Sequence, residues 1–413
     1  MPKLRFPEFR DSEEWEENLL GSICKTSSGG TPSTTQKEYY GGDIPFIRSA
    51  EIDKETTELF LTTEGLNNSS AKLIKKGDVL VALYGANSGD VALAKIDGAI
   101  NQAILCLKSE ESNPFIYQFL SFKKNWIVST YIQGGQGNLS GEIIKSIKIP
   151  LPKLKEQQKI ADCLSSLDEL ITAQSQKLQA LKAHKKGLMQ QLFPAEGETV
   201  PKLRFAEFRD SGEWEEKTLG QCLLQHPQYG INAPAVPFSN NLPTYLRITD
   251  ISEDGFFLKN QMVSVEKEVS EDNYLQEGDI VLTRTGASVG KSYKYRIEDG
   301  ELVFAGFLIR VKPDKDKINS ELLFQYLSTE QYWDWVDFIS ARSGQPGING
   351  NEYASMPIIL PPSLNEQQKI ADCLSSLDEQ ISTQTEKIDA LEVHKKGLMQ
   401  ALFPQLNESV QTS

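Results

Sequence analysis

The chain has 413 residues, of which 39% are hydrophobic and 24% charged, and this balance predicts a folded protein of two or three domains. No apolar run reaches the ~18 residues that a membrane span needs, and the N-terminus has no signal-peptide core, so no membrane partner is expected. Five scattered cysteines without a Cys-x-x-Cys pair argue against a disulfide framework or a zinc site and indicate a cytoplasmic protein. A net charge of −14 disfavours nucleic acid as a ligand, unless the Lys and Arg residues gather on one face or a partner supplies positive charge.

The first residues of the chain open an internal repeat. Pro2–Arg10 returns as Pro201–Arg209, with eight of nine residues identical. A second block, Lys155–Pro194, returns as Asn365–Pro404, with 29 of 40 residues identical. The two inserts between these blocks share only scattered pieces. A duplicated enzyme would be expected to keep its catalytic residues in both copies, whereas this chain keeps its scaffold.

Each insert, residues 22–150 and residues 221–360, is predicted to end in the same three elements. They are an amphipathic helix, a glycine-rich loop and a proline-flanked strand. In chain order they span about 114–130, 134–141 and Ile147–Leu151 in the first insert, and about 320–339, 344–350 and Pro357–Leu360 in the second. The layout is therefore frame, insert, frame, insert.

The inserts also contain loops with clusters of polar, aromatic and basic residues. Such side chains suit DNA, because Arg can bond guanine in bidentate fashion, Asn or Gln can bond adenine, and Ser, Thr and backbone N–H groups can hold phosphates. The alternative is that the glycines and prolines mark ordinary turns and the tyrosines pack in the core. The candidate DNA-binding residues are Thr31, Ser33, Tyr39, Arg48, Tyr84, Asn87, Gln136, Asn138, Tyr229, Asn232, Tyr245, Arg247, Arg284, Ser288, Lys291 and Gln345.

The block after each insert is predicted to form a long helix, because apolar residues recur at steps of three and four as in a coiled coil. About 38 residues at 1.5 Å each give a rod of roughly 57 Å. Both helices end before a Phe-Pro pair, where proline cannot continue the helix. Ser363 followed by Glu366 predicts a capping box at the start of the second helix. The predicted helix-pairing residues are Ile160, Leu164, Leu167, Ile171, Gln174, Leu178, Leu181, Leu188, Ile370, Leu374, Leu377, Ile381, Gln384, Ile388, Leu391 and Leu398.

A glutamine and a lysine interrupt the apolar seam at equivalent positions of each helix. Buried polar residues of this kind set the register of helix pairing at some cost in stability. The alternative is that they point to solvent at a loose part of the seam. Antiparallel pairing with full overlap places Gln174 opposite Gln384 near a pseudo-twofold axis, Lys185 near Asp372, and Lys395 near Asp162.

No motif in the chain indicates catalysis. Gly286–Ser292 resembles a phosphate-binding loop but is one residue short, and a strand rather than a helix is predicted after it. Pro313-Asp314 could begin a nuclease motif, but no Glu-x-Lys partner follows it in a strand. The chain also lacks an Asn-Pro-Pro-Tyr or Asp-Pro-Pro-Tyr stretch, which an adenine methyltransferase needs. No catalytic residue, metal ligand or cofactor is therefore expected.

Three features of the sequence resemble the specificity subunits of type I restriction-modification systems. The first is Trp-Glu-Glu…Leu-Gly at the start of each repeat, residues 15–21 and 214–220. The second is Gly-Gly-Thr-Pro-Ser…Tyr-Tyr-Gly-Gly-Asp-Ile-Pro-Phe at residues 29–46. The third is Ile-Pro-Leu-Pro…Glu-Gln-Gln-Lys-Ile-Ala at residues 149–161, echoed at residues 359–371. The resemblance covers essentially the whole chain.

The resemblance implies an α+β fold with two target recognition domains of mainly antiparallel sheets, joined by two long antiparallel coiled-coil helices with pseudo-twofold symmetry. Each domain would read one half of an asymmetric, split site in double-stranded DNA, and the helices would set the gap between the halves. Two methyltransferase subunits would dock on this scaffold, restriction subunits would add translocation and cleavage, and all cofactors would belong to those partners. The implied boundaries are 1–151 for target recognition domain 1, 152–194 for helix 1, 195–200 for a linker, 201–361 for target recognition domain 2, 362–404 for helix 2 and 405–413 for a C-terminal tail.

Two competing hypotheses remain open on the sequence. A self-contained nuclease or methyltransferase would need a catalytic motif that the sequence does not contain. A pure coiled-coil scaffold without DNA contact would not explain why two inserts diverged between constant frames.

Overall fold

The computed structural model describes residues 1–132, 138–341 and 345–404. The chain divides into two compact units, of which unit 1 comprises Met1–Gln176 with Glu386–Ser413, and unit 2 comprises Lys177–Thr385. Each unit thus contains one insert with its frame, half of the helix that follows that insert, and half of the other helix. Within the described residues, no helix is both long and apolar enough to cross a membrane. The predicted C-terminal tail, 405–413, lies outside the described residues.

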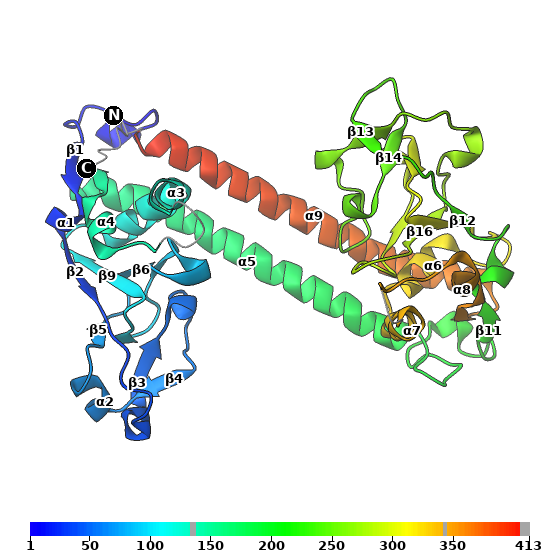
Figure 1. Cartoon of the computed structure of the whole chain (residues 1–413), viewed down its shortest axis with the longest axis horizontal. Coiled ribbons are helices and arrows are strands. Elements are labelled where there is room, and N and C mark those ends of the chain that lie inside the picture. The colour runs from blue at the N-terminus through cyan, green and yellow to red at the C-terminus, as the bar shows by residue number, and fades with distance from the viewer. Residues whose placement is uncertain (133–137, 342–344, 405–413) are drawn as a thin grey trace. The chain divides into compact units, whose positions relative to one another are not determined.

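The first insert folds into two four-stranded sheets. One is antiparallel, with the order β2 (Cys24–Ser28), β9 (Ile104–Ser109), β6 (Val79–Ala82) and β7 (Val91–Leu93). The other has the order β4 (Leu59–Leu61), β3 (Tyr40–Ile47), β8 (Gly98–Ile100) and β5 (Lys72–Ile74), and here β3 and β8 are parallel. In Figure 1 the sheet with β6 and β9 lies nearer to α5 (Leu154–Leu192) than the sheet with β3 and β4.

Strand β6 is the centre of unit 1, because both of its faces are buried. Val79 and Val81 belong to the core under the helices, whereas Leu80 and Ala82 belong to the core between the sheets. This alternation follows from the two-residue period of a strand and explains why β6 is apolar throughout.

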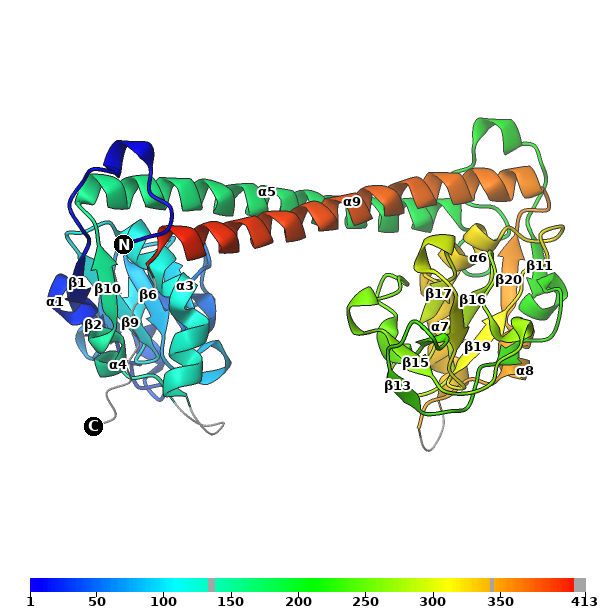
Figure 2. The same ribbon diagram turned by 90° about the horizontal axis from the view of Figure 1, so that it is seen from above.

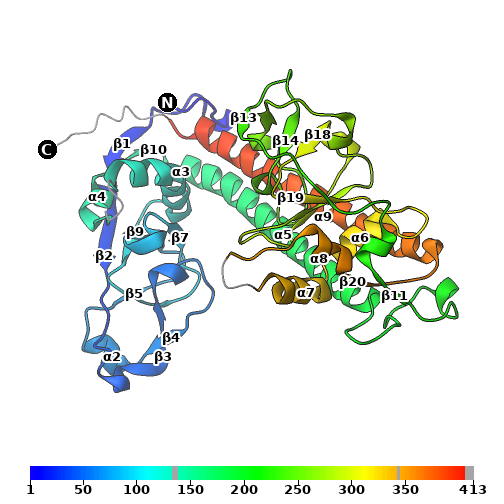
Figure 3. The ribbon, with the colours of Figure 1, turned by 45° about the vertical axis from the view of Figure 1, so that its right-hand side comes forward.

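Besides the long helices, four α-helices and a two-stranded ribbon accompany these sheets in the described part of unit 1. Strand β1 (Glu16–Leu19) pairs antiparallel with β10 (Lys148–Leu151), and the two lie side by side in Figure 3. The longest of the helices starts at a serine cap, where the Ser112 hydroxyl accepts a bond from the Phe115 N–H at 3.3 Å. The helices are α1 (Leu20–Ile23), α2 (Thr63–Asn67), α3 (Asn113–Tyr131) and α4 (Gly141–Ser146).

Unit 2 repeats this architecture. One antiparallel sheet has the order β12 (Gln228–Tyr229), β19 (Leu308–Val311), β16 (Ile280–Thr283) and β17 (Ser292–Lys294), and a two-stranded ribbon pairs β11 (Glu215–Thr218) with β20 (Pro357–Leu360). The other sheet has the order β13 (Ala235–Pro237), β15 (Val263–Val265), β14 (Thr244–Leu246) and β18 (Leu302–Phe304), with β14 and β18 parallel. The prediction of an α+β fold with mainly antiparallel sheets is confirmed.

The helix predicted at 320–339 is two helices in the structure, α6 (Ser320–Tyr326) and α7 (Glu330–Ser340). The break lies at Thr329, whose hydroxyl donates to the Tyr326 carbonyl at 2.7 Å and accepts from the Tyr332 N–H at 3.3 Å. One side chain thus caps α7 just after α6 has ended. Helix α8 (Gly350–Ser355) follows, and Figure 2 shows α6 lying between β17 and α9 (Leu364–Leu402).

Each long helix ends in a phenylalanine that is buried in the core of a unit. In unit 1, the ring centroid of Phe403 lies 5.5 Å from that of Phe115 and 5.6 Å from that of Phe119. In unit 2, the ring of Phe193 lies 6.2 Å from Trp214 and 5.9 Å from Tyr326. A buried aromatic ring removes a large apolar area from water, so each repeated Phe-Pro end fastens its half-helix to the globular part of the unit that it enters.

The predicted aspartate partners of the two helix lysines are wrong, whereas the full overlap of the helices stays a prediction. Lys185 Nζ lies 2.6 Å from Asp378 in unit 2, not near Asp372, and Lys395 pairs with Asp168 in unit 1, not near Asp162. Both pairs confirm antiparallel pairing, with each lysine meeting its partner six residues further along than predicted. The opposition of Gln174 and Gln384 stays a prediction.

The first turn of each long helix packs on its own half of the chain. The Arg5 guanidinium forms two bonds to Glu156, at 2.7 and 2.8 Å, and Gln157 accepts from the Ser112 N–H at 3.1 Å. Arg204 holds Glu366 in the same way, also at 2.7 and 2.8 Å. These bonds fix the start of each helix against the segment that precedes it in the chain.

This contact also alters the predicted capping box. Ser363 does accept a bond from the Glu366 N–H, at 3.4 Å. In a capping box, the Glu366 carboxylate would accept from the Ser363 N–H. Here both of its oxygens accept from Arg204 instead.

The helix-to-helix ion pairs are extended into the inserts by a glutamine. In unit 1 the side-chain amide of Gln118 donates to Asp168 at 2.7 Å, and in unit 2 that of Gln325 donates to Asp378 at 2.7 Å. Both glutamines are fully buried. We name these two sets network 1 (Gln118, Asp168, Lys395) and network 2 (Gln325, Asp378, Lys185). Each network links the insert of its unit to both half-helices.

Candidate nucleic-acid interface

In each unit, four loops meet at one end of the antiparallel sheet. Loop cluster 1 consists of residues 28–33, 83–90, 101–103 and 138–140, and loop cluster 2 consists of residues 229–233, 284–291, 305–307 and 345–349. Backbone hydrogen bonds join the loops at equivalent places. In loop cluster 1 the Leu83 N–H donates to the Ala103 carbonyl at 2.8 Å, and the Leu83 carbonyl accepts from the Leu139 N–H at 3.0 Å.

The same two bonds recur in loop cluster 2. The Arg284 N–H donates to the Phe307 carbonyl at 3.1 Å, and the Arg284 carbonyl accepts from the Ile348 N–H at 2.8 Å. Leu83 and Arg284 therefore occupy the same backbone position in the two units. Because both polar groups of this residue are bonded, its Cα is held and its side chain is presented from a rigid base.

The hairpin turn that follows also has one conformation in both units. Gly85 and Gly89 have φ values of +79° and +87°, and Gly286 and Gly290 have +82° and +87°. Side chains rarely adopt this region, so the four glycines preserve the turn. The residues between and beside them are free to differ, and they do, as Tyr84-Gly-Ala-Asn-Ser-Gly-Asp in loop cluster 1 and Thr285-Gly-Ala-Ser-Val-Gly-Lys in loop cluster 2.

This turn settles the resemblance of Gly286–Ser292 to a phosphate-binding loop. The Gly290 N–H donates back to the Thr283 carbonyl at 3.0 Å, and the chain continues as strand β17. A phosphate-binding loop would lead into a helix N-terminus. The segment is a β-hairpin turn.

Gly29 and Gly230 identify equivalent positions in the loops that precede the two hairpins. A Cβ atom on Gly29 would lie 1.7 Å from the Ile100 carbonyl oxygen, and one on Gly230 would lie 2.3 Å from that of Ala305. Both segments therefore cross the end of a strand at a distance that only glycine allows. This equivalence pairs Thr31 with Asn232, although the two surrounding sequences show no similarity.

Loop cluster 1 presents uncharged polar groups. The Thr31 hydroxyl donates to the side-chain oxygen of Gln102 at 2.7 Å, and both residues are exposed. Tyr84 is 38% exposed and Asn87 is half-buried. Asn138 is exposed, as is Ser33 just beyond the cluster boundary, and Gln136 lies outside the described residues.

Loop cluster 2 presents a guanidinium group on an aromatic ring. The Arg284 Cζ lies 4.9 Å from the centroid of the Tyr229 ring, which is 47% exposed. The Tyr229 hydroxyl in turn accepts from the Gly350 N–H at 2.9 Å. Asn232 and Gln345 are exposed beside this pair.

Two further candidates of loop cluster 2 are less accessible. Ser288 is half-buried in the hairpin turn. Lys291 pairs with Glu253 at 2.6 Å, and its side chain is 13% exposed. A lysine held in this way is a weaker phosphate ligand than a free one, because its charge is partly neutralised.

Two of the predicted residues, Tyr39 and Tyr245, have contacts within the inserts, as does the neighbouring Tyr40, which was not predicted as a site residue. Tyr245 is buried, and its hydroxyl donates to the Ile231 carbonyl at 2.6 Å, so burial raises the pKa of this phenol. Its predicted contact with DNA is wrong because its polar atom is used inside the protein. Tyr40 bonds the corresponding loop of unit 1, through the Pro32 carbonyl at 2.7 Å. Tyr39 lies beside α2, where its carbonyl accepts from the Thr62 N–H at 3.0 Å.

Arg48 and Arg247 occupy equivalent positions and both hold an acidic residue three positions later. Arg48 bonds Glu51 through two nitrogens, at 3.0 and 2.9 Å. Arg247 bonds Asp250 at 2.9 and 2.7 Å. Burial alone would raise the pKa of Glu51, but the bonds from Arg48 and from the Glu58 backbone lower it to about 2. These arginines support the short turns after β3 and β14, and their predicted contact with bases stays a prediction.

Two residues of the loop clusters were missed in the sequence. Gln102 lies between β8 and β9, and Phe307 lies at the equivalent turn between β18 and β19 with 60% of its surface exposed. The available signal was a polar pair, Asn101-Gln102, between two apolar strands, and an aromatic residue after Gly306. Neither pattern differs from an ordinary turn until the neighbouring loops are placed.

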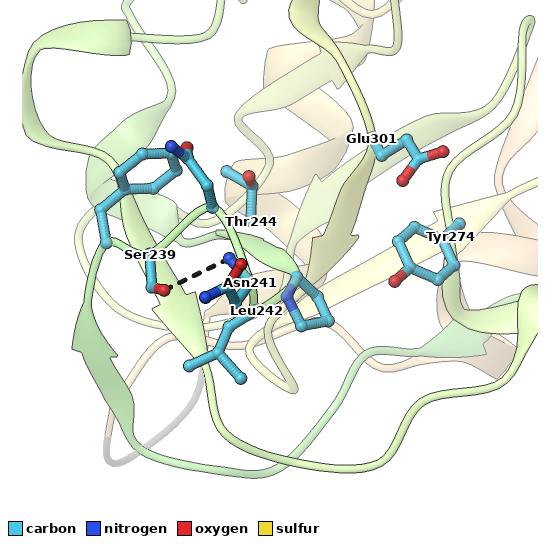
Figure 4. A pocket seen from close by; sticks show the side chains of 9 residues that line it. Ser239, Asn241, Leu242, Thr244, Tyr274 and Glu301 are labelled. Atoms are coloured by element: carbon cyan, nitrogen blue, oxygen red, sulfur yellow. Dashed lines mark hydrogen bonds between the residues drawn. The ribbon is translucent and has the colours of Figure 1, made fainter.

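Unit 2 also contains a cavity of about 430 Å³ next to the loop between β13 and β14. Figure 4 shows Ser239 and Asn241 on one side of it and Tyr274 and Glu301 on the other. The charged group in its lining is a carboxylate, which does not favour a phosphate ligand. Among the described residues, no group of three or more His, Cys, Asp or Glu side chains could hold a metal ion.

The sequence model of the family described as the type I restriction modification DNA specificity domain matches residues 12–183 and 235–393, which is most of the chain. The chain is 25% identical over 408 residues to the type I restriction enzyme MjaVIII specificity subunit of Methanocaldococcus jannaschii, covering 95% of this chain and 93% of the relative. It is 24% identical over 379 residues to the EcoKI specificity subunit of Escherichia coli, covering 87% and 81%.

Solved structures show the same fold. The S subunit of a type I restriction-modification system from M. genitalium superposes with a TM-score of 0.65 at 17% identity, covering 98% of this chain and all of the other. A chain from a structure on complex assembly and conformational transition of the type I system superposes with a TM-score of 0.51 at 18% identity, covering 95% and 98%. The chain belongs to the family of type I restriction-modification DNA specificity subunits.

Proposed function

We propose that this specificity subunit reads a split DNA site, with loop cluster 1 on one half-site and loop cluster 2 on the other. The observation that carries the proposal is that loop clusters 1 and 2 share one backbone conformation but present different side chains. The hairpin turns have matching glycine φ values, while Leu83 is replaced by Arg284 and Gln102 by Gly306 at equivalent positions. Constant presentation with variable side chains is what two different base sequences require. The boundaries proposed for the two recognition domains are those expected from the sequence.

We infer that two copies of one methyltransferase subunit dock on the repeated frames. The support is identity at exposed positions of the two long helices. Gln158, Lys159 and Ser166 are exposed on α5, and the equivalent residues of α9 are exposed and identical. Two copies of one surface suit two copies of one partner. Such a partner could also supply the positive charge that DNA requires, since the chain itself carries −14.

The gap between the half-sites is proposed to depend on the long helices. Networks 1 and 2 each tie an insert to both half-helices of its unit, so each recognition surface has a defined attachment to the helices. Restriction subunits are proposed to join the same complex, and the cofactors are assigned to the partner subunits. The alternative of a self-contained nuclease or methyltransferase has no support among the relatives, which are specificity subunits.

Methylome sequencing of cells that express this chain with its methyltransferase subunit tests the proposal. The expected motif is asymmetric and split, because the two loop clusters differ. A chimera with residues 221–356 replaced by residues 22–147 should give a palindromic split motif. In the matched control, residues 221–356 are encoded by synonymous codons, and the wild-type motif should be kept. An unchanged motif in the chimera would show that the inserts do not determine sequence preference.

A further inference from the structure

Among the described residues, Arg284 and Arg296 are the arginines of the inserts without a carboxylate partner, and the two differ in their surroundings. Arg48, Arg247 and Arg310 are ion-paired, to Glu51, Asp250 and Asp279. Arg296 is enclosed by two phenylalanine rings and donates to backbone carbonyls. The positive charge of Arg284 is therefore not neutralised within the described part of unit 2.

The guanidinium of Arg284 is nevertheless held in one orientation. It stacks on the ring of Tyr229 at 4.9 Å, and that ring is anchored through its hydroxyl to the Gly350 N–H. The backbone of Arg284 is bonded on both sides, as described above. Its Nη1 lies 3.5 Å from the Gly306 carbonyl, at the limit of a hydrogen bond, and its Nε is buried without a partner within the described residues, so the donors available to DNA are those of the terminal nitrogens. The Arg284 guanidinium therefore still has hydrogen-bond donors to offer, and its position is already fixed.

A fixed orientation of the guanidinium group distinguishes an arginine that binds a base edge from one that contacts a phosphate. A phosphate can be neutralised by any mobile cation, and an exposed lysine is sufficient for it. A guanine edge offers two acceptors side by side, and a planar guanidinium fits them only when its plane is held. Arg284 has the second set of properties, because its plane is set by Tyr229 and its base is set by two backbone bonds.

The equivalent position of unit 1 cannot make this contact. Leu83 is buried there, and Gln102 bonds Thr31 in the space next to it. In unit 2 the residue that replaces Gln102 is Gly306, which leaves room for the longer arginine. The two units thus present different hydrogen-bonding groups from the same backbone position.

We propose that Arg284 is a specificity-determining residue that reads a guanine through its major-groove edge, in the half-site bound by unit 2. The proposal rests on the proposed function, since it needs loop cluster 2 to face DNA. Tyr229 acts as a positioning residue that holds the guanidinium plane. No guanine at the corresponding place is required in the half-site bound by unit 1.

The test compares four variants, each expressed with the methyltransferase subunit: Arg284→Ala, Arg284→Lys, Tyr229→Phe and Tyr229→Leu. Methylation is measured on a DNA library in which each position of the wild-type motif is varied singly. Arg284→Ala and Arg284→Lys should each reduce discrimination at one G·C pair of the unit 2 half-site by about 5- to 150-fold and leave the other positions unchanged. Tyr229→Leu should reduce it at the same pair, and Tyr229→Phe, which keeps the ring but loses the hydroxyl bond to the Gly350 N–H, should reduce it at that pair by less than Tyr229→Leu does.

Several outcomes overturn the proposal. A uniform loss across all sequences means that Arg284 contacts phosphate, and an unchanged motif means that it contacts no base. A changed position in the other half-site, or at an A·T pair, is equally incompatible with it. If Arg284→Ala does not fold, the conclusion rests on Arg284→Lys, and wild-type discrimination in that variant overturns the proposal. The insert chimera separates this failure from failure of the proposed function, because the chimera changes a half-site even if Arg284 reads nothing.

Discussion

Network 2 makes a prediction that separates the observed partner of Lys185 from the expected one. Asp378 accepts bonds from Lys185 on the other helix and from Gln325 of the insert. The side chains of Lys185 and Asp378 are 16% and 23% exposed, so the pair is mostly withdrawn from water. Asp378→Ala leaves the lysine charge without its partner in this position. Removing one member of a fully buried pair costs about 3–5 kcal/mol, and partial exposure reduces this to about 2–4 kcal/mol here.

The other variants of the series have different expected costs. Lys185→Met should cost about 1–2 kcal/mol, because Asp378 keeps its bond from the buried glutamine and methionine fills the same space. The double variant Lys185→Met, Asp378→Leu should cost less than the sum of the single variants, with a coupling energy of about 1–3 kcal/mol. Asp372→Ala is the matched control. This residue was the expected partner of Lys185 but bonds Gln368 on the same helix face, so its loss should cost under about 0.5 kcal/mol.

Guanidinium-induced unfolding followed by circular dichroism measures these differences, and the equivalent residues of network 1 allow the series to be repeated in unit 1. An Asp372→Ala cost equal to that of Asp378→Ala would refute the reasoning. Strict additivity of the double variant would also refute it, because the two side chains would then not interact.

Three further predictions follow from the helices and the turns. One heptad inserted after Gln174 and one after Gln384 should widen the unread gap between the half-sites by about two to four base pairs. The reason is that seven helical residues add about 10.5 Å, whereas one base pair adds about 3.4 Å. An unchanged gap in the methylome of an active complex would contradict this prediction. Arg48→Ala and Arg247→Ala should each lower the free energy of unfolding by about 1–3 kcal/mol and weaken methylation of all sequences alike, whereas lost discrimination at one base in the library assay would indicate direct reading. The pKa of Glu51 is lowered from 4.5 to about 2 in the folded protein, so its ion pair stabilises the fold above pH 4.5 and that stabilisation is lost as the pH falls towards 2. Melting temperatures between pH 2 and pH 7 should therefore fall less steeply on the acid side for Glu51→Gln than for the wild type, and parallel curves would show that the pair does not form.

Much of the fold could be predicted because its signals are local in the sequence. The helix lengths follow from an apolar period of three and four that stops at Phe193 and Phe403. The shared order of elements at the end of each insert was predicted because both inserts show the same local patterns there. The single helix expected at 320–339 was wrong. Threonine also occurs inside helices, so the sequence did not show that Thr329 caps a second helix until the structure showed that α6 ends before it.

Less of the candidate site could be predicted, because it is assembled from loops that are far apart in the chain. The sequence shows that Arg48, Arg247 and Arg284 are arginines in polar surroundings, and it does not distinguish among them. The structure gives the first two a carboxylate three residues away and stacks the third on Tyr229. A side chain's role depends on which groups compete for its hydrogen bonds.

Two constant frames, two diverged inserts and two long pairing helices can be recognised from the sequence alone, because identity and periodicity are properties of the sequence. The partners of the charged helix residues come from tertiary contacts. Glu156 and Glu366 bind arginines of their own frames, and Lys185 and Lys395 bond aspartates six residues beyond the predicted ones. These contacts join residues more than 150 positions apart in the chain, and burial of the charged groups makes each pairing specific, so no local pattern in the sequence indicates them.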